Sequence, residues 1–235
     1  MISFIVPAHD EAVLIGATLA AIHAAARADG ADYDLIDVDD ASTDATAVVA
    51  RAHGARVLAV AHRHIAATRN AGARVATGER LVFVDADTLI DASVLGAALR
   101  ALDQGAVGGG ATVRMTGALA WHERALVAMA VPLLRGLRIA PGCFFFCTRA
   151  AFERAGGFDE SLYAAEDVAL SFALARLGRF ELLRETVATS ERKLRTFGVG
   201  EHLALVWRFA LHGRGALRSR EHLALWYDKR RHGPR

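Results

Sequence analysis

The sequence of 235 residues predicts an α/β fold, in which a mostly parallel sheet is flanked by helices. Two observations predict it. Short apolar runs alternate with alanine-rich segments of helical period up to about Leu102, and polar residues directly follow several of these runs. Parallel strands need crossover connections of a dozen or more residues, which helices usually provide. The alternation therefore predicts a doubly wound half within residues 1–102.

Four strands and three helical crossovers are predicted in this first half. The strands are centred on apolar runs at Ile2–Val6, Leu35–Val38, Arg56–Val60 and Leu81–Val84. The helices between them are predicted at Val13–Ala28, Asp44–His53 and Ile65–Ala76. We expect Ser42 or Thr43 to be the N-cap of the second helix, and Gly78 to mark the end of the third.

The pattern becomes mixed after residue 102. Gly105–Gly110 is rich in glycine, Trp121–Leu134 is predicted as an apolar helix, and Cys143–Cys147 is predicted as a strand. No internal repeat or linker is visible, so we expect a single domain over residues 1–235. It would consist of a sheet-forming half at 1–102, a mixed half at 103–198 and an amphipathic helical tail at 199–235.

The composition favours a cytoplasmic protein. The formal net charge is only +2, which argues against a broad nucleic-acid interface. No uncharged apolar run approaches the roughly 18 residues of a membrane span, and the first residues lack the features of a signal peptide. The two cysteines, Cys143 and Cys147, are expected to be buried thiols in a reducing compartment.

Carboxylates follow the predicted strands, where ligands bind in open parallel sheets. They are Asp10 and Glu11, Asp39 and Asp40, and Asp85 and Asp87. Several carboxylates at one edge repel one another unless a cation or a ligand's hydrogen-bond donors offset their charge. Oxygen ligands suit Mg²⁺ or Mn²⁺, so the sequence Asp85-Ala86-Asp87 predicts a metal site, with a solvated turn as its alternative.

Two other acidic pairs allow a structural and a functional interpretation. Asp39 and Asp40 could form a turn or cap a helix, or they could accept a hydrogen bond from a nucleobase ring nitrogen. Glu166 and Asp167 lie at the start of a helix predicted to reach Leu177, where carboxylates stabilise the helix dipole. The functional alternative is a general base that takes a proton from an attacking hydroxyl.

Five ordered motifs resemble those of the bacterial glycosyltransferase family 2 enzymes, which have the Rossmann-like GT-A fold that binds nucleotide sugars. The motifs are Ile5-Val6-Pro7-Ala8-His9-Asp10-Glu11, Val38-Asp39-Asp40-Ala41-Ser42-Thr43-Asp44, Thr68-Arg69-Asn70-Ala71-Gly72, Val84-Asp85-Ala86-Asp87, and Gly156-Gly157-Phe158-Asp159-Glu160 with Glu166-Asp167. They cover roughly Ile2 to Gly178. The resemblance therefore implies a GT-A sheet with a nucleotide-sugar half and a mixed acceptor-side half.

The resemblance also implies a role for individual residues. Asp167 would be the catalytic base, and Asp87 would be the stronger candidate for a direct metal ligand beside Asp85. In the nucleotide-sugar site, Pro7, Ala8 and Asp40 would contact the nucleobase, and Asp39 and Glu11 would lie near the nucleoside. Arg69 would lie near the phosphates, and Asp85 and Asp87 would face the ribose and the metal. Ala86 and Glu166 would lie nearby.

The implied activity is transfer of a sugar from a nucleoside-diphosphate sugar by one inverting displacement, assisted by Mn²⁺ or Mg²⁺. A UDP-sugar is favoured over a GDP-sugar because uridine carriers are the commonest in the family. The Gln-x-x-Arg-Trp motif of processive synthases is absent from the sequence, which favours single transfer. The sequence names neither the sugar nor the acceptor, and it leaves the oligomeric state open.

Four positions depart from the family pattern. His9 and Asp10 replace a usual tyrosine and asparagine, so the stacking on the nucleobase is expected to differ. Ala169 and Ala173 stand where the family often has a second acidic residue and an arginine, which puts acceptor or phosphate contacts of that helix in question.

Alternative functions involve the same fold. A nucleotidylyltransferase should carry a glycine-rich basic loop after the first strand, which Pro7-Ala8-His9-Asp10-Glu11 does not provide. A non-catalytic nucleotide-binding or membrane-associated scaffold is suggested by the tail, where Trp207 and Trp226 alternate with basic residues. Such a tail would allow peripheral contact with the inner membrane surface and a lipid-linked acceptor. Whether His202 or His212 in the tail ligates metal stays open.

Overall fold

The computed structural model describes residues 1–115 and 139–189, and within them eight strands form one sheet. The strand order is β3-β2-β1-β4-β7-β6-β8-β5. The strands are β1 Ile2–Ala8, β2 Tyr33–Asp40, β3 Arg56–Val60, β4 Arg80–Val84, β5 Thr88–Leu89, β6 Ala106–Met115, β7 Phe144–Thr148 and β8 Arg179–Thr189. All five strands predicted from the sequence are present.

The sheet changes from parallel to mixed at one junction. Strands β1 to β4 pair in parallel, whereas β7 is antiparallel to both β4 and β6. Strand β8 then pairs in parallel with β6 and antiparallel with β5. The mostly parallel first half and the mixed second half confirm the predicted fold class, and the pair β4–β7 joins the two halves.

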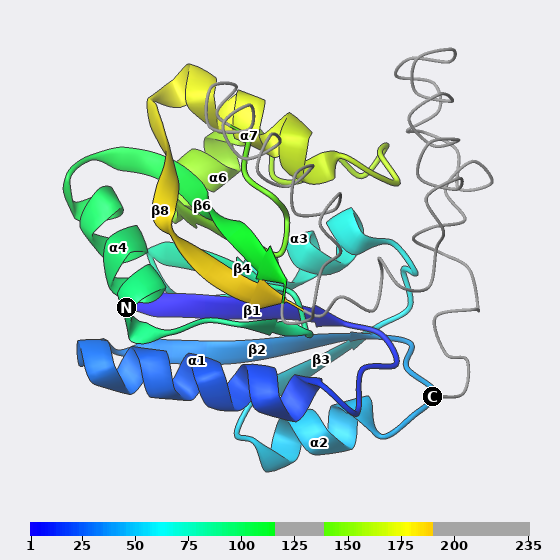
Figure 1. The fold of residues 1–235 in the computed structure, drawn as a ribbon. Coiled ribbons are helices and arrows are strands. Elements are labelled where there is room, and N and C mark those ends of the chain that lie inside the picture. Colours follow the sequence, from blue (N-terminus) through cyan, green and yellow to red (C-terminus); the bar gives the residue numbers. More distant parts are fainter. Residues whose placement is uncertain (116–138, 190–235) are drawn as a thin grey trace, which may run out of the picture.

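Helices cover both faces of the sheet (Figure 1). They are α1 Ile15–Asp29, α2 Thr46–Ala52, α3 Ile65–Val75, α4 Ala92–Asp103, α6 Arg149–Ala155 and α7 Glu166–Leu177. Side chains of α1, α2 and α4 pack into one core cluster and those of α3, α6 and α7 into another. Alternate residues of a strand point to opposite faces, so Phe4 joins the first cluster and Ile5 the second.

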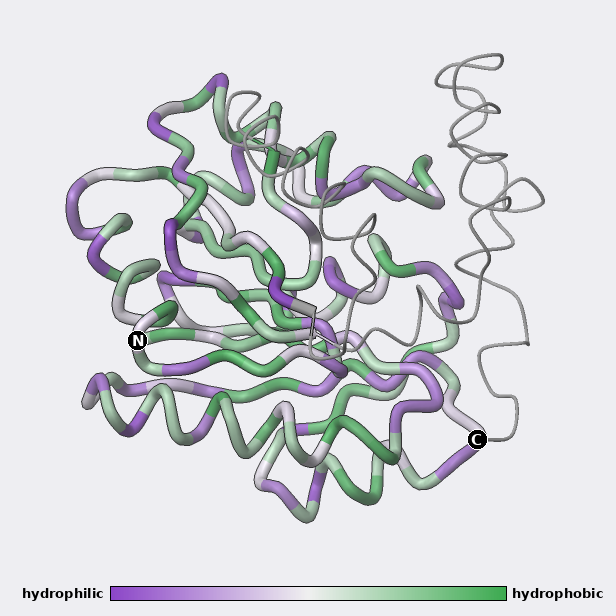
Figure 2. Tube along the Cα trace, in the orientation of Figure 1, coloured by the Kyte–Doolittle hydropathy of each residue, from purple (hydrophilic) through white to green (hydrophobic). Residues whose placement is uncertain are grey.

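The hydropathy of the chain follows these two layers. Figure 2 shows that the central strands are mainly hydrophobic and that hydrophilic residues concentrate in loops and on outer helix faces. Burying both faces of a parallel sheet requires such apolar runs. The polar residues that follow the strands are therefore left at the sheet edge, where they form the candidate site.

Two predicted helix boundaries are wrong. Helix α2 has Ala45 as its N-cap, while Ser42 and Thr43 instead hydrogen-bond to Asp10. Helix α3 ends with the C-cap Ala76 before the chain reaches Gly78. A Cβ atom at Gly78 would lie 2.7 Å from the Ser3 nitrogen, so this glycine permits close contact with β1.

Several predictions fall outside the described residues. They concern the helix Trp121–Leu134, the tail at 199–235 with its tryptophans, and His202 and His212. Within the described residues, no helix combines the length and apolar character needed to span a membrane. Both cysteines are free thiols, and of the two only Cys147 is fully buried.

Candidate active site

The carboxyl ends of β1, β2 and β4 bring the predicted donor residues to one edge of the sheet. Ala8 pairs with Asp39 in the parallel register of β1 and β2, and Asp85 directly follows β4. Pro7 and Ala8 are buried at the end of β1. The convergence expected from the sequence therefore occurs in the structure.

Asp40 fixes the loop that leads into α3. Its carboxylate accepts hydrogen bonds from the backbone N–H groups of Arg63 (2.7 Å) and His64 (3.1 Å) and from the Thr68 hydroxyl (2.8 Å). Both carboxylate oxygens are engaged, so the side chain is held firmly at the end of β2. Its predicted contact with a nucleobase stays a prediction.

Asp39 differs from its neighbour, because its buried Oδ1 atom has no hydrogen-bond partner among the described residues. A buried oxygen without a partner is costly, and a ligand that donates a hydrogen bond would relieve that cost. Glu11 follows the end of β1 by three residues, and its backbone N–H donates to the Thr46 hydroxyl at 2.8 Å. This bond ties the loop after β1 to α2.

Arg69 joins the two halves of the molecule. Its buried guanidinium donates to Asp85 at 2.8 Å and to Glu166 at 2.7 Å, and it also donates to the Gly142 carbonyl at 2.9 Å. Burial alone would lower the pKa of Arg69, but the charges of Asp85 and Glu166 outweigh that effect and raise the pKa above its ordinary value, so the residue stays charged. The structure thus places Arg69 in an ion-pair network, and its contact with phosphates stays a prediction.

Asp167 lies beside this network in the first turn of α7. Its Oδ1 atom accepts from the Val168 N–H at 2.8 Å. Burial and the neighbouring Glu166 charge raise the pKa of Asp167 to about 6, although Arg69 opposes the shift. A carboxylate with such a pKa is ionised near neutral pH and is a stronger base than an ordinary aspartate. Both properties suit general-base catalysis.

Gly142 brings the network and Asp167 together. A Cβ atom at this position would lie 3.0 Å from the Asp167 Oδ2 atom and 3.1 Å from an Arg69 guanidinium nitrogen. Both charged atoms therefore approach the same point, and a Cβ atom at residue 142 would require them to shift by a few tenths of an ångström. The sequence predicts no role for Gly142, because only the fold shows which side chains approach it.

Asp85 and Asp87 lie in a turn at the end of β4. The Asp85 N–H donates to the Cys143 carbonyl at 3.1 Å, and the Thr18 hydroxyl donates to the Ala86 carbonyl at 2.8 Å. One Asp85 oxygen is engaged by Arg69. Within residues 1–115 and 139–189, the buried Asp87 carboxylate receives a long 3.4 Å hydrogen bond from the Thr189 hydroxyl and no shorter one.

These residues fit a divalent cation that is held partly by substrate. The described residues contain no group of three or more histidine, cysteine or acidic side chains placed to hold a metal. Magnesium-like ions commonly take one or two protein carboxylates and complete their shell with substrate phosphates and water. Asp87 fits this arrangement best because its carboxylate has the weakest protein contact of the pair.

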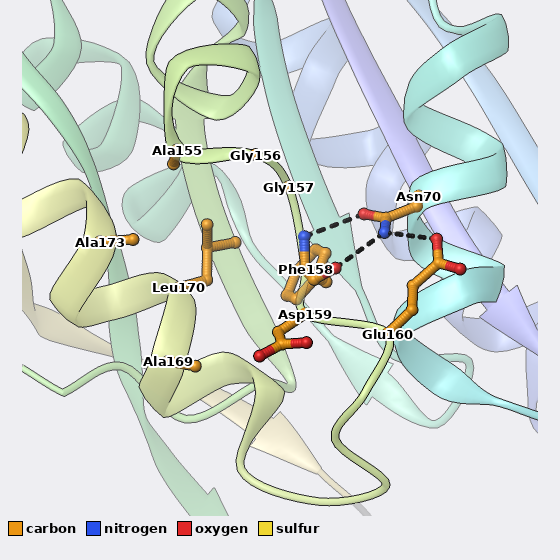
Figure 3. A pocket seen from close by; sticks show the side chains of 10 residues that line it. All are labelled: Asn70, Ala155, Gly156, Gly157, Phe158, Asp159, Glu160, Ala169, Leu170 and Ala173. Carbon is orange, nitrogen blue, oxygen red and sulfur yellow. Dashed lines mark hydrogen bonds between the residues drawn. The ribbon is translucent and has the colours of Figure 1, made fainter.

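Asn70 belongs to the motif Thr68-Arg69-Asn70-Ala71-Gly72, but the sequence predicts no function for its side chain. Its side-chain amide donates to the Phe158 carbonyl at 2.9 Å and to Glu160 at 2.8 Å, and its carbonyl accepts from the Phe158 N–H at 3.0 Å. Figure 3 shows these three bonds reaching from α3 to the loop before α7. Asn70 therefore braces the segment that leads to Asp167.

Replacing Asn70 by alanine is expected to destabilise the protein by about 2–3 kcal/mol, because it leaves buried backbone groups of Phe158 without partners. Chemical denaturation would measure the change. The control is Arg74→Ala on the same helix, whose exposed side chain makes a long 3.8 Å ion pair with Glu160. Equal unfolding midpoints for the two variants would contradict the bracing role.

A pocket of about 480 Å³ lies beside the same loop. Ala169 and Ala173 line one wall, and Asn70 and Glu160 line another (Figure 3). Asp167 is not among the lining residues, although it belongs to the same helix. The two alanines that depart from the family pattern thus coincide with a hollow that larger side chains would fill.

Comparisons with known proteins agree with this architecture. A family model described as "Glycosyl transferase family 2" matches residues 3–161, more than half of the chain. No curated protein matches the sequence.

Solved structures share the fold at low sequence identity. S. aureus TarS (residues 1–349) has 17% identity and a TM-score of 0.65, with 96% of this chain and 77% of TarS covered. The mannosyltransferase PcManGT from Pyrobaculum calidifontis, in complex with GDP-Man and Mn²⁺, has 23% identity and a TM-score of 0.65, covering 98% and 72%. Glucosyl-3-phosphoglycerate synthase from Mycobacterium tuberculosis, with Mn²⁺, UDP and glucosyl-3-phosphoglycerate, has 21% identity and a TM-score of 0.61, covering 94% and 81%.

Proposed function

Because the chain belongs to glycosyl transferase family 2, we propose that it transfers a sugar from a nucleoside-diphosphate sugar to an acceptor hydroxyl with inversion at the anomeric carbon. A UDP-sugar is favoured over a GDP-sugar, although both nucleotides occur in complexes of proteins with similar structures. One observation carries the proposal. The Arg69 network brings the donor-side Asp85 next to the acceptor-side Glu166 and Asp167.

The proposed mechanism assigns the donor to the sheet edge. Pro7, Ala8, Asp39 and Asp40 would hold the nucleoside, with Glu11, Ala86 and Arg69 nearby. Asp87, together with Asp85, would hold Mn²⁺ or Mg²⁺. The bound cation would neutralise the negative charge that develops on the leaving diphosphate.

Asp167 is proposed to act on the acceptor. Its ionised carboxylate takes the proton of the acceptor hydroxyl while the hydroxyl oxygen attacks the anomeric carbon. The bond from that carbon to the diphosphate oxygen breaks in the same step, and the electron pair leaves with the diphosphate. A single displacement inverts the configuration, and no covalent enzyme intermediate forms.

Calorimetric titration of UDP and GDP, each with and without Mn²⁺, tests the donor half of this proposal. We expect one nucleotide to bind in the presence of Mn²⁺ and to lose most of its affinity when the metal is chelated. Absence of binding by both nucleotides in all conditions would remove the support for a nucleotide-sugar donor.

Replacing Asp87 by alanine is expected to weaken nucleotide binding in the presence of Mn²⁺ by roughly 10- to 100-fold, the range seen when a supporting group of a metal site is lost. In the presence of chelator the variant and the wild type should bind alike. Asp103→Asn is a suitable control because Asp103 is exposed and its ion pair is with Arg80, away from the proposed metal site. Unchanged affinity of the Asp87 variant with metal would argue against its role as a ligand.

The acceptor is proposed to include lipid-linked hydroxyl compounds, reached by peripheral contact of the tail at 199–235 with the inner membrane surface. The interleaved tryptophans and basic residues of the tail support this proposal. The full chain is expected to co-sediment with anionic vesicles more strongly than a chain ending at residue 198. Equal co-sedimentation of the two chains would contradict the membrane contact.

A further inference from the structure

Asp37 is a buried acidic residue that the proposed mechanism does not use. It lies in the middle of β2, its side chain is fully buried, and neither of its carboxylate oxygens has a hydrogen-bond partner among the described residues. A charged carboxylate in that position would pay a large desolvation penalty, so such groups normally take up a proton or serve a function. Protonation of Asp37 would give it a hydroxyl hydrogen to donate.

The surroundings of Asp37 are mainly apolar. Val6 of β1 and Val57 of β3 are its register partners, and the buried residues of α1 include no titratable side chain. The charged groups that act on it are Asp39 on its own strand and Arg51 on α2. Burial raises the pKa of Asp37 to about 7, the Asp39 charge raises it as well, and Arg51 opposes the shift.

Asp39 is the natural acceptor for the Asp37 proton. The two residues are separated by two positions on the strand, so they point to the same face with their Cα atoms about 7 Å apart. The buried Oδ1 atom of Asp39 also has no hydrogen-bond partner among the residues that the structure describes. Two acidic side chains at this spacing can be joined directly or through one buried water, which typically bridges such groups.

We infer that Asp37 in its neutral form is a positioning residue for Asp39, and through it for the nucleoside of the donor. This inference rests on the proposed function, because Asp39 is assigned to the nucleoside only there. The neutral acid donates to the Asp39 carboxylate and holds it at the sheet edge. Once Asp37 loses its proton, two carboxylates on one face of β2 repel each other, and Asp39 loses its support.

The structure therefore links donor binding to pH through a residue that does not contact the donor. Binding should weaken as the pH rises through the pKa of Asp37. The free energy of unfolding should also fall as the pH rises. The native state keeps a proton on Asp37 that the unfolded chain has already lost above about pH 4. The penalty from Asp37 thus grows between pH 4 and pH 7 and is complete above that range.

Calorimetry of UDP and GDP with Mn²⁺ between pH 6.0 and pH 8.5 tests the inference on the full chain. The wild type should lose roughly three- to tenfold more affinity over this range than Asp37→Asn, which keeps the shape and a hydrogen-bond donor without titrating. Asp37→Val, which cannot donate, should bind roughly three- to tenfold more weakly than the wild type at pH 6.0. An Asp37→Asn variant with the pH dependence of the wild type would overturn the inference, as would full affinity of Asp37→Val at pH 6.0.

Denaturant unfolding of the same proteins separates this inference from the proposed function. The unfolding midpoint of Asp37→Asn should exceed that of the wild type by an amount that grows from pH 5 to pH 7 and then levels off. If one nucleotide binds but the variants do not differ from the wild type, the inference fails and the donor proposal stands. If neither nucleotide binds, both fail, and a growing midpoint difference would then show that Asp37 titrates without any link to a donor.

Discussion

Replacement of Asp167 by asparagine is expected to abolish sugar transfer while leaving nucleotide binding nearly intact. Asparagine keeps the size of the side chain and its contact with the Val168 N–H, but it cannot take a proton from the acceptor. Loss of a general base typically lowers the rate by 10²- to 10⁴-fold, so we expect kcat to fall by roughly that factor. Single-turnover assays with the identified donor, together with calorimetry of the nucleotide, would measure the two quantities.

The pH dependence gives the same prediction a second readout. The carboxylate accepts a proton only when it is ionised, so kcat/KM of the wild type should rise with pH and level off above the Asp167 pKa of about 6. That rising limb should be missing from the residual activity of Asp167→Asn. Glu153→Gln, which removes an exposed acidic charge from α6, is the control and should leave the profile unchanged. Parallel loss of transfer and nucleotide affinity in Asp167→Asn would make the residue structural.

Replacement of Arg69 by alanine is expected to destabilise the fold by about 3–5 kcal/mol, the cost of removing one partner from a buried ion pair. The variant leaves Asp85 and Glu166 without their shared cation and next to Asp167. Arg69→Met should be similarly unstable, because it restores much of the volume but none of the charge. Denaturant unfolding at pH 7 would measure both variants.

The matched control for this prediction is Arg74→Ala, five residues further along α3. The Arg74 side chain is 62% exposed and its ion pair with Glu160 is 3.8 Å long, so its loss should change stability by less than about 0.5 kcal/mol. Destabilisation of Arg69→Ala should also shrink at low pH, where protonation removes the repulsion among the remaining carboxylates. An Arg69→Ala protein as stable as the Arg74→Ala control would show that the buried network contributes nothing.

The first half of the fold could be predicted because its signals are local. The strands β1 to β4 are short apolar runs that alternate with segments of helical period. This alternation predicts each strand and also its parallel pairing, because a helix carries the chain back between successive strands. The convergence of Ala8, Asp39 and Asp85 at one edge follows from that topology alone. The caps were less predictable, because Ser42 and Thr43 bond to Asp10 across the loop instead of capping the adjacent helix.

The second half depends on contacts that the sequence does not display. Strand β6 contains three consecutive glycines, which weaken any strand signal. They are tolerated because β8 passes very close, so that a Cβ at Gly109 would collide with the Glu181 carbonyl. Likewise, the motif Thr68-Arg69-Asn70 indicated a site, but Arg69 meets Glu166 across 97 positions of chain. Only folding shows that the arginine binds carboxylates of the protein itself.

The bond between the Asp85 N–H and the Cys143 carbonyl has a mechanical consequence. It fastens the turn that carries Asp85 and Asp87 to the segment just after Gly142, and Gly142 in turn lies against Asp167. The turn and Asp167 are therefore linked by one hydrogen bond and one peptide unit, outside the hydrophobic core. If the proposed donor binds at the turn and the proposed acceptor at Asp167, any increase in acceptor affinity caused by the donor must be matched by an equal increase in donor affinity caused by the acceptor, since such coupling is reciprocal.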